Sequence, residues 1–143
     1  ELDGGPIVAQ APVPLDDGLD HAALDARLGA AGAALYAATL ARDAGRAPAA
    51  RAQQRAAASY FGLPRDEDFR VSTAWSARRV FNFIRGTGVW GHAYPIALDG
   101  GEQRLRTALG YTAEGALPAP AVRVGNALRV RCSPGVLHAT LDG

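Results

Sequence analysis

The stretch DAGRAPAARAQQRAAAS, residues 43–59, constrains the fold most because it contains no large apolar side chain. A segment of this composition buries too little apolar surface to belong to a folded core. Pro48 also lacks the backbone N–H that a continuous helix requires. We therefore predict a linker over residues 44–59, with short helical turns, and separate folded segments over residues 1–43 and 60–143.

The segment before the linker combines an extended run with one long helix. Residues 6–10 are typical of a strand and follow the acidic, glycine-rich turn at Asp3. From residue 21 to residue 42, apolar residues recur at the three-and-four spacing of one helical face. The residues of this face are Leu24, Leu28, Ala31 and Leu35. A narrow face of Leu and Ala suits a helix packed on a sheet, and we expect most of that sheet to lie outside this sequence.

One helix is predicted near the start of the second segment. Ser72 or Thr73 is in position to cap it, because either hydroxyl can accept a hydrogen bond from the free N–H groups of a first turn. Its apolar stripe consists of Ala77, Val80, Phe81 and Ile84.

Short strands are predicted after this helix. Residues 93–98 and 102–109 flank the turn DGG and predict a hairpin. Residues 121–124 and 127–132 flank the turn GN and predict a second hairpin. The run over residues 136–141 predicts a fifth strand. Five short strands after one helix indicate an α+β unit with a small, partly open barrel.

Charge and cysteine content exclude few classes of function. The net charge is +1, so the chain as a whole makes no case for a nucleic-acid partner. Cys132 is the single cysteine and cannot form an intramolecular disulfide. No apolar run approaches the roughly 18 residues of a membrane span, so we expect a cytoplasmic protein with no membrane partner. The chain contains no Met, so we expect further residues to precede Glu1 in the translated protein.

Metal-binding and nucleophilic side chains are scattered along the chain. The histidines at positions 21, 92 and 138 have no Cys or carboxylate partner at metal-ligand spacing, so no metal site is predicted. Cys132 alternates with Leu128 and Val130, so we expect it in the core rather than as a nucleophile.

The second segment is mildly basic, with ten Arg against seven acidic residues. Side chains alternate between the two faces of a strand, so Arg104 shares a face with Arg106, and Arg129 shares a face with Arg131. Arg123 is expected to join them. Such a face can follow a phosphate backbone, or it can be an ordinary solvated face.

Three further residues are candidates for function. The rings of Trp90 and Tyr94 can stack on a ligand, although aromatic residues beside a glycine-rich loop also close small cores. A tight Gly-Gly loop can hold Asp3 rigidly for proton transfer or for orienting a His. The alternative for Asp3 is a simple turn.

Five stretches, in order, resemble the 10-formyltetrahydrofolate-dependent formyltransferases of the methionyl-tRNA formyltransferase type. LDGGPIVAQ resembles the LD-x-G-x-I segment at the end of the family's Rossmann-like catalytic domain, and LDARLGAAGAALYAATL resembles its final helix. SYFGLPRDEDFRVS resembles the start of the family's C-terminal domain, and WSARRVFNFIRG resembles its Ser-Ala-x-x-Ile helix. ALRVRCSPGVLHATLDG resembles the closing hairpin of an OB-like barrel. The resemblance covers nearly the whole chain.

The resemblance implies the tail of a Rossmann-like catalytic domain at residues 1–43, then the linker, then an OB-like domain at residues 60–143. It implies transfer of a formyl group from the co-substrate 10-formyltetrahydrofolate to an amine, without a metal. Asp3 matches the family's catalytic Asp, which orients a His of an upstream Asn-x-His motif. The missing N-terminal catalytic segment is therefore an expected partner, and this chain alone is expected to be inactive.

The resemblance leaves the formyl acceptor open, because the loop GTGVWGHAY differs from the family's Pro-rich loop. Methionyl-tRNA, a small amine such as an amino sugar, an amino acid or hydroxamate precursor, and the water used by hydrolase relatives all remain. The competing class is a non-catalytic OB-like module that binds RNA or a protein partner. The candidate contacts for acceptor or nucleic acid are Arg104, Arg106, Arg123, Arg129, Arg131, Trp90 and Tyr94.

Overall fold

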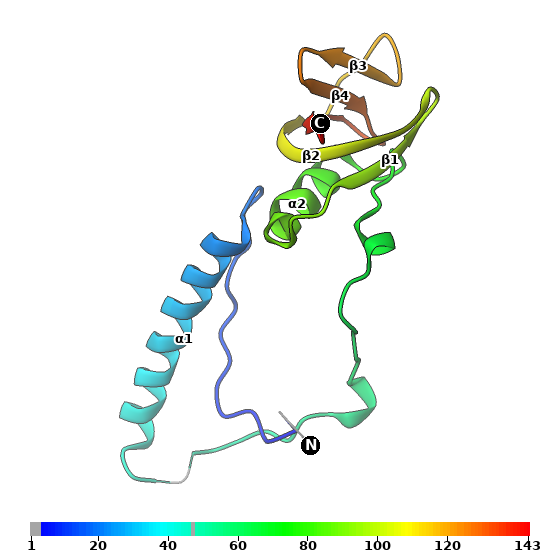
Figure 1. Ribbon diagram of the computed structural model, residues 1–143. Helices are drawn as coiled ribbons and strands as arrows, with labels where there is room; N and C mark the ends of the chain where they lie inside the picture. The colour runs from blue at the N-terminus through cyan, green and yellow to red at the C-terminus, as the bar shows by residue number, and fades with distance from the viewer. Residues whose placement is uncertain (1–3, 47) are drawn as a thin grey trace. The chain divides into compact units, whose positions relative to one another are not determined.

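The computed structural model describes residues 4–46 and 48–143 (Figure 1). Asp3, the candidate catalytic residue, lies outside the described residues. The described chain divides into two compact units. The N-terminal unit comprises residues 4–15, 22–46 and 48–63, and the C-terminal unit comprises residues 16–21 and 64–143. Residues 16–21 are thus grouped with a part of the chain that follows them by more than forty positions.

The N-terminal unit contains helix α1 (His21–Asp43), whose first residue belongs to the C-terminal unit. The helix confirms the one predicted over residues 21–42. None of its residues is buried, and Leu28 and Leu40 are exposed. The apolar stripe that the sequence predicts therefore forms without a core beneath it in the described part of the chain. Helices in proteins are stabilised mainly by packing of such a face, so this stripe contributes little to stability here.

The predicted strand over residues 6–10 is wrong, apart from one residue pair. Ile7 and Arg51 form an isolated antiparallel bridge, with the Ile7 N–H 2.8 Å from the Arg51 carbonyl and the reverse bond at 2.9 Å. Gln53 Nε2 adds a bond of 2.7 Å to the Gly5 carbonyl. Within the predicted linker, the described residues include a 3-10 turn, η1 (Arg55–Ala57). Among its described residues, the N-terminal unit forms no sheet.

The C-terminal unit contains helix α2 (Ala77–Thr87). The helix starts later than predicted, because Ser76 rather than Ser72 or Thr73 is its cap. The Ser76 hydroxyl accepts a hydrogen bond from the Arg79 N–H at 3.2 Å. The Ser72 hydroxyl instead closes a local turn by accepting from the N–H two residues on.

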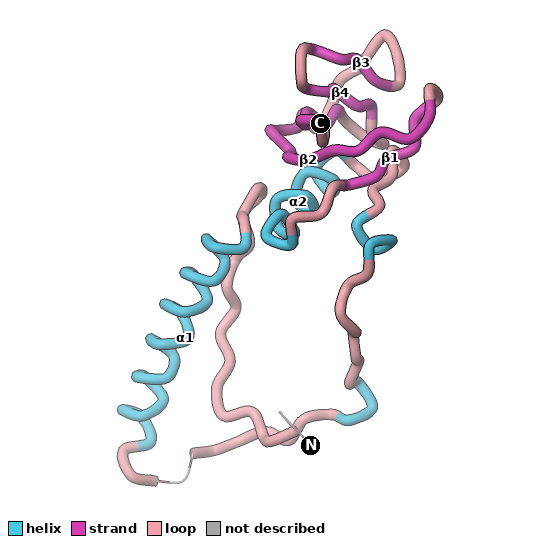
Figure 2. Tube along the Cα trace, in the orientation of Figure 1, coloured by secondary structure: helices cyan, strands magenta, loops and turns pink. Residues whose placement is uncertain are grey.

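A five-stranded antiparallel sheet follows α2, as the helix and strand colours of Figure 2 show. Its strands are β1 (Tyr94–Leu98), β2 (Gly101–Thr112), β3 (Ala121–Val124), β4 (Ala127–Arg131) and β5 (Val136–Leu141). Both predicted hairpins and the fifth strand are confirmed. The strand order is β1-β2-β5-β4-β3, and two register shifts between β2 and β5 mark bulges that increase the twist of β2.

The sheet curls, and α2 packs against the face that β2 and β5 present to it (Figure 1). The fold is therefore α+β, with two helices and a curled, five-stranded antiparallel sheet. Helix α2 buries Ala77, Val80 and Ile84, three of the four residues predicted for its stripe. The sheet contributes Ile96, Leu105, Ala108, Leu128, Val130, Leu137 and Ala139 to the same core. No helix in the described residues is long and apolar enough to cross a membrane.

Candidate functional site

The candidate site contains four arginines on the outer side of the sheet, which faces away from α2. Leu105 on β2 and Leu128 and Val130 on β4 point into the core, so their neighbours in each strand point outward. We call Arg104, Arg106, Arg129 and Arg131 the arginine face. Strand β5 lies between β2 and β4, which separates the two pairs by about 10 Å across the sheet. The register also offsets them along β5, because Leu105 is opposite Leu141, whereas Arg129 and Arg131 are opposite His138 and Val136.

The β2 pair of the arginine face is partly neutralised. The Asp142 carboxylate lies 3.7 Å from Arg104 Nε and 3.9 Å from an Arg106 guanidinium nitrogen. Arg106 also donates a hydrogen bond of 2.6 Å to the Gly91 carbonyl. An anion that approaches these two residues therefore competes with a carboxylate, and Arg106 is held beside the turn that follows Trp90.

The β4 pair differs, because neither Arg129 nor Arg131 forms an ion pair with an acidic residue in the described chain. Arg129 is opposite His138 in the register of β4 and β5. Arg129 Nε and His138 Nε2 are buried and have no hydrogen-bond partner among the described residues. A buried donor without an acceptor costs free energy, so this pair is held in the sheet at a cost.

Arg123 does not join the arginine face. It is opposite Leu128 in the register of β3 and β4, and residues opposite one another project from the same side of a sheet. Its side chain is on the core side of the sheet at the exposed edge strand, where its Nε donates to the Gly125 carbonyl at 3.3 Å.

The two candidate aromatic residues have different environments. Tyr94 is 0% exposed and packs in the core, which is the second of the two alternatives that the sequence left open for it. Burial raises the pKa of its hydroxyl, which lies 2.9 Å from Thr87 Oγ1. Trp90, at the end of the 3-10 turn η3 (Gly88–Trp90), is 47% exposed and keeps a ring surface for a ligand.

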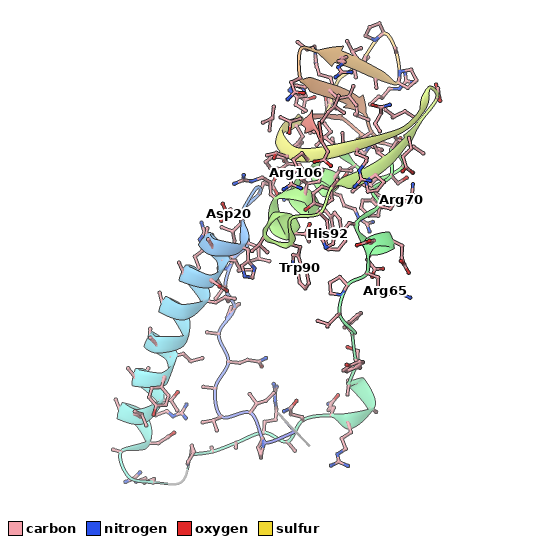
Figure 3. The ribbon with its side chains drawn as sticks, in the orientation of Figure 1. Asp20, Arg65, Arg70, Trp90, His92 and Arg106 are labelled. Atoms are coloured by element: carbon pink, nitrogen blue, oxygen red, sulfur yellow. The ribbon has the colours of Figure 1, made fainter. Side chains whose placement is uncertain are left out.

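A group of side chains around Phe69 supports Trp90. The Phe69 ring is 6.2 Å from the Trp90 ring and stacks on His92 at 4.1 Å. His92 Nδ1 is 3.3 Å from a carboxylate oxygen of Asp66. Trp90 and His92 lie close together in Figure 3. Because Arg106 bonds the carbonyl of the residue between them, the exposed indole is next to the β2 end of the arginine face.

A second polar cluster, absent from the sequence prediction, surrounds Asp17 within the C-terminal unit. The Asp17 carboxylate accepts hydrogen bonds from Arg78 Nε at 2.8 Å, from Asn82 Nδ2 at 2.9 Å and from the Tyr111 hydroxyl. These bonds, with that from Tyr111 the largest, lower the pKa of Asp17 to about 2. The one available signal was the spacing of Arg78, Asn82 and Arg85, which places all three on one helical face.

The remaining predictions concern metals and the lone thiol. Among the described residues there is no group of three or more His, Cys, Asp and Glu side chains that could hold a metal ion. Cys132 is buried in the core, as predicted, and burial raises the pKa of its thiol. A thiol in this state is a poor nucleophile.

Comparison with known proteins does not identify a family. No model of a known protein family matches the chain, and no curated protein matches it significantly. The arrangement of the described residues is therefore the basis for what the site can bind. The outer side of the sheet offers guanidinium donors, and η3 offers the exposed indole ring of Trp90, which together suit the binding of anions and planar groups.

Proposed function

We propose that this chain is the C-terminal portion of a formyltransferase that moves a formyl group from 10-formyltetrahydrofolate to an amine acceptor in the cytoplasm. The proposed activity and co-substrate are those that the resemblance of the five stretches to the family implies. The observation that best supports it is the curled antiparallel sheet of the C-terminal unit, which follows α2 where the family has an OB-like barrel. The apolar stripe of α1, none of which is buried, is also what a helix from a Rossmann-like domain presents when its sheet is elsewhere.

In the proposed reaction the acceptor nitrogen attacks the formyl carbon, and the bond between that carbon and the folate nitrogen breaks. The acceptor nitrogen loses one proton, which an upstream His accepts, and the folate nitrogen gains one. Asp3 orients that His, and the C-terminal unit positions the acceptor. Because the described residues supply neither the His nor a folate site, the proposal assigns this chain a supporting part of the reaction.

The arginine face favours an acceptor that carries phosphates, such as methionyl-tRNA, over a small neutral amine. Arg129 and Arg131 carry this preference, since neither has an acidic partner in the described chain. Phosphate contacts of this kind give affinity that falls as salt is added. The same face supports the second candidate, an RNA-binding module without chemistry of its own.

One experiment tests the enzyme proposal. In the parent protein, Asp3→Asn is expected to abolish formyl transfer while far-UV circular dichroism and the melting temperature stay unchanged. Asp99→Asn, at an exposed turn, is the matched control and should leave turnover intact. Turnover by the Asp3 variant at the wild-type rate would reject the role assigned to Asp3. An upstream reading frame without an Asn-x-His motif would reject the enzyme proposal as a whole.

A second experiment tests the acceptor. Arg129→Ala combined with Arg131→Ala is expected to weaken tRNA binding and to reduce the salt dependence of log K by about 2, roughly 0.9 for each phosphate that the variant no longer neutralises. Arg46→Ala combined with Arg123→Ala removes the same charge away from the arginine face and should change little. Equal affinities for the two double variants would exclude the arginine face as a binding surface and leave the small amines as acceptors.

A further inference from the structure

The segment Asp16–Asp20 lies just before α1 in the chain, yet it belongs to the C-terminal unit. We call residues 16–20 the latch segment. It connects two parts of the N-terminal unit, residues 4–15 and the rest of α1, and its own contacts are with α2 and β2. A five-residue segment with such contacts is a docked element and not a passive connection.

The latch segment docks through one face of α2. Arg78, Asn82 and Arg85 project from that face because they are spaced four and three residues apart. Two of them hold the Asp17 carboxylate, and the third pairs with Asp20 at 3.2 Å.

The backbone of the latch segment is bound as well as its side chains. The Gly18 N–H donates to Asn82 Oδ1 at 2.7 Å, and Arg85 Nε donates to the Gly18 carbonyl at 3.1 Å. Gly18 has a φ of +75°, and a Cβ at this position would lie 2.9 Å from the Phe81 ring. The site therefore requires a glycine directly after the aspartate, for its backbone conformation and for its size.

The docked state is held mainly by polar contacts at the surface. No residue of the latch segment is buried, and the side chain of Arg78 is 65% exposed. Contacts of this kind open at a lower free energy than a packed core, because little apolar surface is exposed on opening. The core of α2 and the sheet does not include the latch segment, so the core can stay folded when the segment is released.

We propose that the latch segment opens and closes on α2 while the C-terminal unit stays folded, and so determines whether the start of α1 is tethered to that unit. When the latch is closed, α1 begins directly after a docked residue. When it is open, α1 is joined to the C-terminal unit only through residues 44–63, which follow the helix. The face of α2 that carries Arg78, Asn82 and Arg85 therefore binds the latch segment of the same chain. This inference does not depend on the proposed enzyme activity.

Hydrogen exchange of the full chain, followed amide by amide by NMR at neutral pH, tests the proposal. The Gly18 amide is expected to exchange more slowly than an unprotected amide and faster than the amides of Val80 and Leu137 in the core. Asp17→Asn should speed Gly18 exchange about tenfold or more, since it weakens a charged acceptor, and should leave the core amides unchanged. Gly18→Ala is a second, independent variant and should release the remaining latch amides in the same way.

Asp99→Asn removes a carboxylate at an exposed turn and is the control, for which Gly18 exchange should match that of the wild type. Three results would overturn the proposal. They are exchange of Gly18 at the rate of the core amides, exchange at the rate of an unprotected amide, and equal Gly18 rates in Asp17→Asn and the wild type.

Discussion

Replacing Tyr94 by Phe removes one hydroxyl from the core of the C-terminal unit and keeps the ring. The hydroxyl lies 2.9 Å from Thr87 Oγ1 and donates to the Ile84 carbonyl at 3.3 Å. Thr87 also donates to the Phe83 carbonyl at 2.6 Å and keeps this bond in the variant. The substitution therefore removes a hydrogen bond without leaving a buried donor unpaired.

The loss expected for the Tyr94→Phe variant is about 1 kcal/mol in the free energy of unfolding, the net value of one such bond. For a unit of this size that corresponds to a fall of roughly 4–8 °C in Tm. Tyr94→Ala should cost about 3–5 kcal/mol, because it also leaves a cavity where a fully buried ring was packed. Tyr36→Phe is the matched control: Tyr36 is 68% exposed on α1, so its loss should stay within about 0.5 kcal/mol.

Urea unfolding followed by tryptophan fluorescence measures the stability of the C-terminal unit, in which Tyr94 lies. Trp75 and Trp90 are in the C-terminal unit, and their rings lie 5.8 Å from Phe83 and 6.2 Å from Phe69. The midpoint should fall in the Tyr94→Phe variant while the slope m is unchanged. A Tyr94→Phe variant as stable as the wild type, or a Tyr36→Phe variant equally destabilised, would refute the buried hydrogen bond.

The Tyr94→Phe substitution is also expected to change how stability depends on pH. Because burial raises the pKa of Tyr94, its neutral form is favoured in the folded state. This contribution to stability is complete below the unfolded pKa of about 10 and is lost as pH rises through the higher folded pKa. The wild type should therefore lose stability above about pH 10 more steeply than Tyr94→Phe. Parallel pH profiles for the two proteins would contradict the raised pKa.

Two further predictions concern Gly135, which directly precedes β5, and the thiol of Cys132. Gly135 has a φ of +95°, and a Cβ there would lie 2.2 Å from the Thr112 carbonyl oxygen, so Gly135→Ala should cost at least ~2 kcal/mol in a thermal melt. Gly62→Ala, with nothing within 4 Å, is its control, and equal melting temperatures would contradict the clash. Cys132 is buried and its thiol pKa is raised, so iodoacetamide should alkylate it far more slowly in the native chain than in urea. Equal rates in the two states would show that the thiol is accessible.

Local sequence patterns were sufficient for most elements of the C-terminal unit. The turns after Leu98 and Val124 have glycine where a hairpin needs it, and alternation in the strands predicts which residues face the core. Alternation also identified the arginine face, since that property depends on neighbours in one strand. The prediction that Arg123 joins this face failed. The face to which a side chain of edge strand β3 points is set by the register of β3 with β4.

The sequence by itself determined helix α1, both hairpins and the outward direction of four arginines, because each depends on residues within a few positions of one another. Tertiary structure alone decided that Tyr94 is a core residue and that residues 16–20 belong to the C-terminal unit. Asp17 meets Arg78 and Tyr111 across 61 and 94 positions of chain. No local propensity encodes a contact of that range, since it exists only after α2 and β2 have packed together and aligned their polar groups.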